Sequence, residues 1–234
     1  MTREIVFDTE TTGRDAAAGD RIVEMGCVEL LNHIPTGRHY HTYLNPQRAV
    51  EPGALAVHGL SNEFLAGHPL FGEVVDQFAA FVGDARLVIH NASFDMAFLN
   101  AELKRLGRPT LPMDRAIDTL QLARRKHPGA SNSLDALCTR YGIDNTKRTK
   151  HGALLDAEIL AEVYIELLGG KQADLGLGPA RAASAGLGGT SSTAARRPRR
   201  EAVSRLTDAE RERHRAFIAT LGDKALWAAY LGES

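Results

Sequence analysis

Residues 5–13, IVFDTETTG, join an apolar run to two carboxylates, Asp8 and Glu10, that stand two positions apart. In an extended strand, side chains at positions i and i+2 point to the same face, so the pattern predicts a buried strand that ends in two neighbouring acids. Such acids repel each other and resist the loss of water. The stretch therefore predicts that something of positive charge binds beside it.

Strand-like and helix-like segments alternate outward from this stretch, up to about residue 168. An early run of strands followed by strand–helix alternation predicts an α/β fold, a mixed sheet with helices packed on its faces. The predicted elements are strands over 4–9, 21–31, 39–46 and 85–91, a turn over 32–38, a strand passing into a helix over 116–129, and helices over 61–67, 70–84, 93–107, 131–143 and 151–170. The predicted helix caps are Ser93, and Ser131 or Asn132.

The bulk composition is that of an ordinary globular protein, with 44% hydrophobic and 24% charged residues and a formal net charge of −1. Global charge therefore does not point to nucleic acid or to a membrane. Cys27 and Cys138 lie in apolar segments and are predicted to be reduced core thiols. With no signal-peptide pattern and no apolar run long enough for a bilayer, we expect a cytoplasmic protein without a membrane partner.

The composition changes after residue 170, which is the predicted end of the first domain (1–170). Residues 171–203 are rich in Gly, Ala, Ser and Arg without apolar periodicity, which predicts a flexible linker. Residues 204–234 become helical again, and Thr207 and Glu210 fit a capping box. So short a helical segment cannot bury enough apolar surface to fold securely alone, so we expect its apolar side chains to face a partner.

Further acids stand where later elements begin. Asp95 falls in the first turn of the helix after the strand over 85–91, and Asp156 falls inside the helix over 151–170. His151 stands five residues before Asp156, about 500° of helical rotation, so we place it in the loop that enters this helix. Each residue also has an ordinary interpretation as a cap, a helix-terminus acid or a solvated side chain. For Asp118 and Asp135, structural roles such as capping are preferred.

Together, four converging carboxylates would be unfavourable unless hard divalent cations bound them. Two such cations, about 3.5–4 Å apart, stabilise both the attacking and the leaving oxygen of a phosphodiester displacement. A neutral histidine beside them can accept a proton from water. The pattern favours hydrolysis by metal-activated water, since no Ser or Cys nucleophile motif is present.

Three motifs carry a family resemblance: FDTETTG, HNASFDMAFLN and HGALLDAEILAEVY. They resemble the three exonuclease motifs of the DEDD superfamily in its histidine-bearing branch, and residues 3–170 are similar to the proofreading subunits of bacterial replicative DNA polymerases. The resemblance implies a ribonuclease-H-like mixed sheet flanked by helices, two Mg²⁺ or Mn²⁺ ions, and 3′→5′ removal of mispaired nucleotides from DNA ends. By the same resemblance the metal ligands are Asp8, Glu10, Asp95 and Asp156, and the general base is His151.

The resemblance also implies how the DNA 3′ end is held. The backbone near Thr9 and Thr11 would approach the terminal nucleotide, and its sugar and base would meet a pocket lined by Val57, His58, Asn91 and Phe94. For Val57 and Phe94, a place in the core is the alternative. The basic residues Lys147, Arg148 and Lys150 fit phosphate contacts, with a solvated charge run as the alternative.

The tail of the chain resembles segments that bind replication partners. QADLGL, residues 172–177, is similar to a sliding-clamp peptide, with Gly176 in place of a larger residue; its contacts would be Gln172, Asp174, Leu175 and Leu177. The segment that includes Phe217, Leu226 and Trp227 would dock on the catalytic polymerase subunit. Whether a small accessory subunit also binds is left open. A superfamily ribonuclease that trims RNA 3′ ends or oligoribonucleotides is the alternative function, and a catalytically silent binding subunit is a third.

Overall fold

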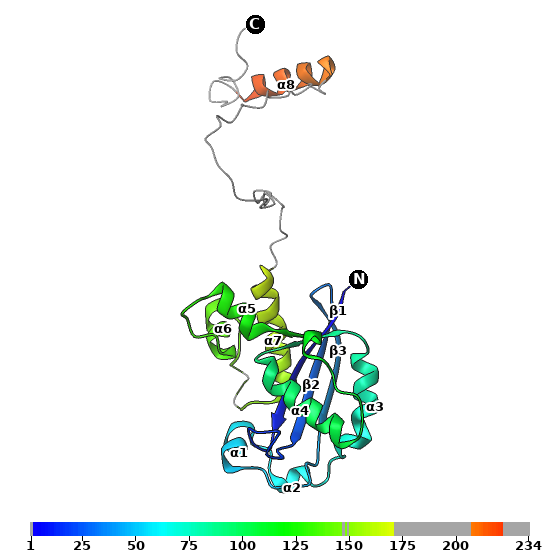
Figure 1. Cartoon of the computed structure of the whole chain (residues 1–234). Coiled ribbons are helices and arrows are strands. Elements are labelled where there is room, and N and C mark those ends of the chain that lie inside the picture. Colours follow the sequence, from blue (N-terminus) through cyan, green and yellow to red (C-terminus); the bar gives the residue numbers. More distant parts are fainter. Residues whose placement is uncertain (1, 147, 149, 171–206, 222–234) are drawn as a thin grey trace, which may run out of the picture. The chain divides into compact units, whose positions relative to one another are not determined.

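The computed structural model describes residues 2–146, 148, 150–170 and 207–221 (Figure 1). By its contacts the chain divides into two units, residues 1–178 and 179–234, and each is described by itself. The predicted linker over 171–203 and the clamp-like peptide over 172–177 lie outside the described residues, as do Leu226 and Trp227. The predicted domain boundaries therefore stay predictions.

In the described part of the chain, five strands form one mixed sheet with the order β3-β2-β1-β4-β5. The pairs β1–β2 and β2–β3 are antiparallel, whereas β1–β4 and β4–β5 are parallel. The strands are β1 (Arg3–Thr11), β2 (Ile22–Leu31), β3 (Ile34–Tyr43), β4 (Arg86–Ile89) and β5 (Ala116–Asp118). The mixed α/β sheet predicted from the sequence is confirmed, with β1 at its centre.

The turn between β2 and β3 is shorter than predicted. It consists of Asn32 and His33, which both have positive φ (50° and 65°), and β3 begins at Ile34. Two-residue hairpin turns with positive φ at both central positions match the twist of the strands that they join. The turn predicted over 32–38 is therefore wrong, because Pro35 and Gly37 lie inside an exposed edge strand, where proline is tolerated.

The helices match the predicted segments with three corrections. Residues 52–58 form a helix where none was predicted, α4 starts from Asn91 and not from Ser93, and Ser133 caps α6 in place of Ser131 or Asn132. The side chain of Asp118 caps α5, as predicted. The helices of the first unit are α1 (Pro52–His58), α2 (Asn62–Leu65), α3 (Phe71–Val82), α4 (Ala92–Arg105), α5 (Thr119–Lys126), α6 (Leu134–Tyr141) and α7 (Ala153–Leu168), with a 3-10 turn at Met113–Arg115.

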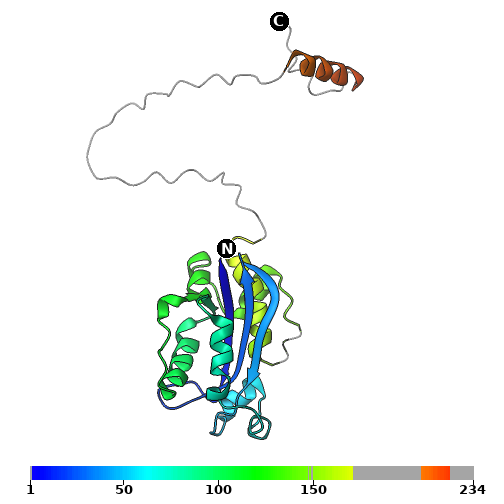
Figure 2. The ribbon, with the colours of Figure 1, turned by 90° about the vertical axis from the view of Figure 1, so that its right-hand side faces the viewer.

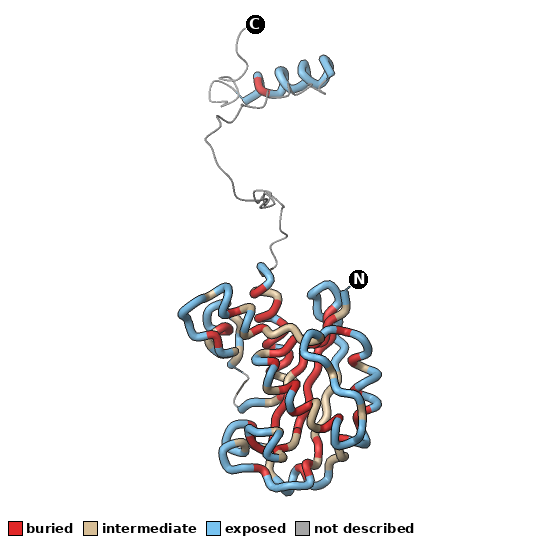
Figure 3. Tube along the Cα trace, in the orientation of Figure 1, coloured by how far each residue is buried: buried red, intermediate tan, exposed pale blue. Residues whose placement is uncertain are grey.

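Clusters of buried apolar residues lie on both faces of the sheet, since alternate residues of β1 point to opposite sides. Ile5 and Phe7 pack with the apolar faces of α3 and α4, whereas Val6 packs with α7, which α5 and α6 cover in turn. Figure 2 shows the sheet between these helices, and Figure 3 shows the buried residues gathered along the strands and the inner faces of the helices. Cys27 and Cys138 are buried and free, which confirms the prediction of reduced core thiols.

The described part of the second unit contains one helix, α8 (Asp208–Thr220). Its predicted capping box is confirmed, because Thr207 and Glu210 each accept a hydrogen bond from the other's backbone N–H. Phe217 is 61% exposed and lies one turn from Leu221, which is 48% exposed. Within the described ranges, every helix is too short or too polar to cross a membrane.

Candidate active site

The candidate site begins where β1 extends past its parallel neighbour. The last pair between β1 and β4 is Val6 with Val88, so Asp8 and Glu10 lie beyond the reach of β4. On the other side β2 still flanks them, with Gly26 opposite Asp8. The end of β1 is therefore open on the side where β4 turns into α4, and open carboxyl ends of strands are where α/β folds form their sites.

Helix α4 brings Asp95 to this opening. Asn91 has a left-handed backbone (φ 68°, ψ 55°), which asparagine tolerates better than most residues, and it turns the chain sharply from β4 into α4. Asp95 follows in the first helical turn and is buried. The Thr9 hydroxyl donates a hydrogen bond of 2.7 Å to its Oδ1, so β1 holds the carboxylate in place.

Helix α7 brings Asp156 to the opposite side of β1. Its first turn packs directly over Gly26, where an added Cβ would stand only 2.3 Å from the Ala153 backbone. His151 lies in the loop before this helix, as predicted, with Gly152 at the N-cap position. The His151 ring is 45% exposed, and its Nδ1 lies 3.2 Å from Asp156 Oδ2.

Arg148 lies in the same loop and forms an ion pair with Asp156. Its Nε is 2.5 Å from Asp156 Oδ1 and its Nη2 is 2.7 Å from Oδ2, the paired geometry in which guanidinium and carboxylate bind best. Its Nη1 donates to Asp135 at 2.6 Å. The basic run was predicted to contact phosphate, but in this structure Arg148 is bound by the site's own acids. Lys147 lies outside the described residues.

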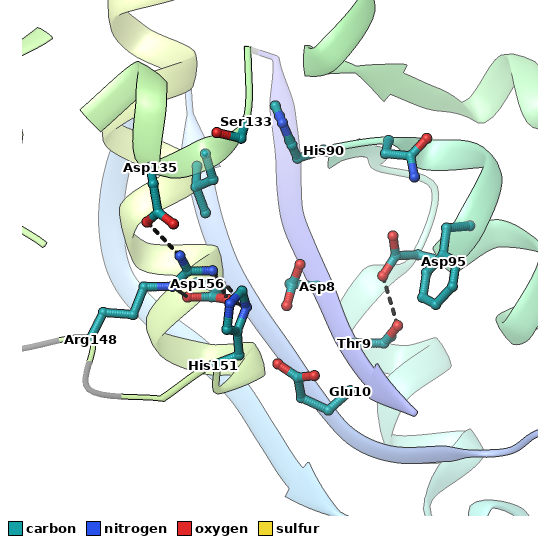
Figure 4. A pocket seen from close by; sticks show the side chains of 13 residues that line it. Asp8, Thr9, Glu10, His90, Asp95, Ser133, Asp135, Arg148, His151 and Asp156 are labelled. Carbon is teal, nitrogen blue, oxygen red and sulfur yellow. Dashed lines mark hydrogen bonds and ion pairs between the residues drawn. The ribbon is translucent and has the colours of Figure 1, made fainter. Parts of the chain in front are cut away.

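These side chains line one hollow of about 280 Å³ (Figure 4). All four predicted metal ligands and the predicted base border it, together with Thr9, Asn91 and Phe94 from the predicted substrate contacts. The described residues that line it are Asp8, Thr9, Glu10, His90, Asn91, Phe94, Asp95, Ser133, Leu134, Asp135, Arg148, His151 and Asp156. The sequence motifs therefore do meet at one place.

Three predicted substrate contacts stand outside this lining, namely Thr11, Val57 and His58. His58 is buried: its Nδ1 accepts from the Leu60 backbone, and its Nε2 lies 3.3 Å from the Thr11 carbonyl oxygen. Val57 is 45% exposed, so it is not a core residue, and its carbonyl accepts from the His151 backbone N–H at 3.3 Å. Phe94 borders the hollow and also packs on Phe98 of the core, with ring centroids 4.8 Å apart.

Three acids of the site, Asp8, Glu10 and Asp95, lie close together, and their pKa values are raised. Burial, followed by repulsion from Asp156 and Glu24, raises the pKa of Glu10 to about 8. Burial raises the pKa of Asp95 to about 7, although the hydrogen bond from Thr9 acts in the opposite direction. Burial and then repulsion from Asp95 and Glu10 raise the pKa of Asp8 well above its ordinary value. The cluster is therefore one that a cation would stabilise.

The donor atoms fit a hard divalent metal ion. Carboxylate oxygens of Glu10 and Asp156 and a ring nitrogen of His151 all lie within 4.8 Å of one another. Oxygen-rich sites of this kind suit Mg²⁺ and Mn²⁺ better than softer metals. Asp8 and Asp95 add two more carboxylates at the same hollow, which gives the site enough ligands for more than one ion.

The pKa of Glu10 predicts how stability depends on pH without divalent metal. Between its ordinary value of 4.5 and about 8, the folded chain keeps a proton that the unfolded chain has lost, so stability must fall as pH rises. Across this window we expect Glu10 to lower the free energy of unfolding by on the order of a few kcal/mol. Denaturant unfolding in chelator at pH 5 and pH 8 measures the change.

The control for this prediction is Glu10→Gln, which resembles the protonated acid at every pH. The variant should lose less stability between pH 5 and pH 8 than the wild type does. Saturating Mg²⁺ should reduce the loss in the wild type, because the cation replaces the proton as the partner of the carboxylate. Equal losses for the two proteins in chelator would contradict the assignment of the pH dependence to Glu10.

The comparisons with known proteins agree with this geometry. Residues 5–164 match the family described as Exonuclease. The DNA polymerase III subunit epsilon of Rickettsia felis is 51% identical over 173 residues, which cover 73% of this chain and 76% of that protein. The Escherichia coli protein of the same name is 50% identical over 178 residues, 73% of each chain. This chain belongs to the family of DNA polymerase III epsilon subunits. Its activity is that of a proofreading 3′→5′ exonuclease, a hydrolase of phosphodiester bonds.

Solved structures support the epsilon family fold. Exonuclease X in complex with 5′ overhanging duplex DNA superposes with a TM-score of 0.57 at 28% identity, over 72% of this chain and 91% of that one. The nuclease domain of 3′hExo, a DEDDh family member bound to rAMP, superposes with a TM-score of 0.62 at 17% identity, over 71% and 91% of the two chains. The second likeness concerns the fold alone, and it confirms the ribonuclease-H-like sheet.

Within this epsilon-family site, His90 and Ser133 border the hollow although the sequence predicted no role for either. His90 is held by Thr119, with 2.9 Å between Nδ1 and the hydroxyl oxygen, and Ser133 caps α6. Asp135 anchors Arg148, which agrees with the structural role predicted for it. A signal for His90 was present in the sequence, since it directly follows the strand that leads to Asp95. The inward turn of Arg148 has no local signal.

Proposed function

We propose that this chain releases nucleotides one at a time from DNA 3′ ends by hydrolysis with two divalent metal ions, Mg²⁺ or Mn²⁺. The observation that supports the proposal is the convergence of four carboxylates and one histidine on a single hollow. In this proposal Asp8, Glu10, Asp95 and Asp156 hold the ions and His151 is the general base. Bound there, the ions would stabilise charge on the attacking and leaving oxygens.

The positions of Asp8, Thr9 and His151 in the hollow suggest a different role for each of them. Asp8 lies between Asp95 on one side and the Asp156–His151 pair on the other (Figure 4), so we assign it the contact with both ions. Thr9 fixes Asp95 through its hydroxyl. His151 stands at the exposed rim, where its ring can reach water and accept a proton.

The substrate contacts are proposed from the same hollow. Asn91 is exposed and Phe94 is partly buried beside Asp95, so they border the space next to the carboxylates, where a terminal sugar and base would lie. Thr9 borders the same space, whereas Thr11, Val57 and His58 lie outside the lining of the hollow and are proposed from the family resemblance alone. The terminal nucleotide must leave the duplex to reach the hollow, and unpairing is least costly at a mismatch, so frayed or single-stranded ends are preferred.

The attachments to other replication proteins remain proposals from the sequence. The relatives are named as polymerase subunits, and we propose that Phe217 with Leu226 and Trp227 binds the catalytic polymerase subunit. We assign the sliding-clamp contact to Gln172, Asp174, Leu175 and Leu177. A tether of this kind would raise the effective concentration of the exonuclease at the primer end. A small accessory subunit is not required by this scheme.

The direct test uses purified chain and single-stranded DNA labelled at its 5′ end. With Mg²⁺ or Mn²⁺ the label should pass through a ladder of products, each one nucleotide shorter, and chelator should stop the reaction. An RNA of the same sequence should be degraded more slowly. No shortening of DNA with either metal would refute the proposal, and faster loss of the RNA would favour the alternative ribonuclease.

A further inference from the structure

Arg148 contacts two of the groups to which the proposed function assigns chemistry, Asp156 and His151. Its side chain is only 8% exposed, and two nitrogens of its planar guanidinium fork, Nε and Nη2, bind the two carboxylate oxygens of Asp156. The same Nη2 is 2.7 Å from Nδ1 of His151. The remaining nitrogen, Nη1, reaches Asp135 on α6. One cation therefore connects a proposed metal ligand, the proposed base and a neighbouring helix.

The contact with His151 determines where the ring can carry its proton. Two partners compete for Nδ1: Asp156 at 3.2 Å would require a proton on this nitrogen, whereas Arg148 at 2.7 Å requires a bare lone pair. A guanidinium does not lose its protons and can only donate, so the shorter contact makes Nδ1 the acceptor. The neutral ring then carries its proton on Nε2 and has no free lone pair to accept a proton from water.

The contact with Asp156 opposes metal binding. A guanidinium in the paired geometry neutralises the carboxylate and uses a lone pair on each oxygen. A dication at the same carboxylate would face a fixed positive charge a few ångströms away, so the two cations disfavour each other. Asp135, whose side chain is 61% exposed, already accepts a hydrogen bond from Nη1 of Arg148, so it would remain as a partner of Arg148 when Asp156 binds a metal ion.

We propose that Arg148 is a positioning residue that keeps the metal-free site inactive. It binds Asp156 and His151 at the same time, and binding of divalent metal displaces it from both. Metal loading and release of the base are thereby coupled in one step, so the base becomes competent only when the ions that it serves are bound. The inference rests on the proposed function, because it takes Asp156 as a metal ligand and His151 as the base.

The test is the affinity for Mn²⁺, measured by titration of the full chain with detection of free Mn²⁺ by electron paramagnetic resonance. Arg148→Met keeps the bulk of the side chain and removes its charge and its donors. We expect it to bind Mn²⁺ at least about tenfold more tightly than the wild type, the effect of one charged hydrogen-bond contact. Lys150→Met is the matched control, since Lys150 is exposed in the same loop and is not among the described residues lining the hollow. This control should change the affinity by less than about twofold, as exposed charges do.

A second variant separates the contact from the charge. Arg148→Lys keeps the positive charge but loses the planar fork, so it should bind Mn²⁺ more tightly than the wild type and less tightly than Arg148→Met. Without metal, Arg148→Met should melt at a lower temperature, because Asp156 loses its partner, and Mn²⁺ should raise its melting temperature more than that of the wild type.

The outcomes distinguish this inference from the proposed function. If the wild type binds no Mn²⁺, the metal site itself is refuted. If the wild type binds Mn²⁺ and Arg148→Met binds it no more tightly than Lys150→Met does, only the role of Arg148 is overturned. An Arg148→Lys chain with wild-type affinity would show that charge near the site, and not the fork on Asp156, sets the affinity, which also overturns the inference.

Discussion

Asp8→Asn is expected to lower the rate of nucleotide release by about 10³-fold or more, the equivalent of several kcal/mol of lost charge stabilisation. Asp8 stands between the other acids of the site, and burial with the repulsion from Asp95 and Glu10 keeps its pKa well above the ordinary value. The amide has nearly the same shape but carries no charge, so the variant should fold and, in chelator, should be at least as stable as the wild type. Release of labelled nucleotide and thermal unfolding measure the two effects.

Asp76→Asn is the matched control for this prediction. Asp76 lies on α3, is 78% exposed on its side chain, and pairs with Arg108 at the surface. Solvent screens exposed pairs of this kind, which contribute little to stability, so both the rate and the melting temperature should stay close to those of the wild type. If the Asp8→Asn chain digests DNA as fast as this control does, the assignment of Asp8 as a metal ligand is wrong.

The second large effect is expected from Gly26→Ala. The new Cβ would stand 2.3 Å from the backbone of Ala153 and from the Leu154 nitrogen, so the start of α7 must move away from β2. Crowding of a packed site costs about 1–3 kcal/mol of stability. Because α7 carries Asp156 and follows His151, a shift of about 1 Å should also lower the rate by about 100-fold.

Gly53→Ala provides the comparison for this substitution, since outside its own helix backbone and chain neighbours no described atom lies within 4 Å of the position its Cβ would take. Gly53 lies in α1, where alanine is the better helix former, so stability should stay the same or rise by up to about 1 kcal/mol. Melting temperature and nuclease rate should be measured for both variants. Wild-type values for Gly26→Ala would show that α7 does not press on β2 at this point.

The parts of the fold that the sequence predicts are those with a strong local pattern. The apolar run before Asp8 places β1 correctly, and the caps at Asp118 and Thr207 follow from side chains that satisfy their own helix starts. The acids of the candidate site were predictable for the same reason, since Asp8 and Glu10 end the apolar run of β1, and Asp95 and Asp156 lie in the first turns of α4 and α7. The family resemblance then joined motifs that are far apart in the chain.

The features that the sequence misses are set by competing local signals or by tertiary contacts. Pro35 and Gly37 suggested a turn, but the chain turns earlier at Asn32 and His33, since both adopt positive φ. The helix that begins at Pro52 is only seven residues long and has no periodic apolar stripe. Arg148 stands in a basic run, and its contact with Asp156 depends on the approach of the loop to α7, which no local pattern in the sequence indicates.

The packing of α7 on β1 also sets the order of events during synthesis. Tyr164 donates a hydrogen bond of 2.9 Å to Glu4, across 160 positions of the chain, and Asp156 meets Asp8 and Glu10 over a similar separation. Contacts so distant in sequence form late, because the chain between them must first lose the conformational entropy of closing a long loop. A ribosome delivers β1 long before the last turn of α7, so the growing chain exposes its paired acids without their partners. If Asp156 and His151 have their proposed roles, we expect the nascent protein to degrade nucleic acid only after α7 has emerged and docked.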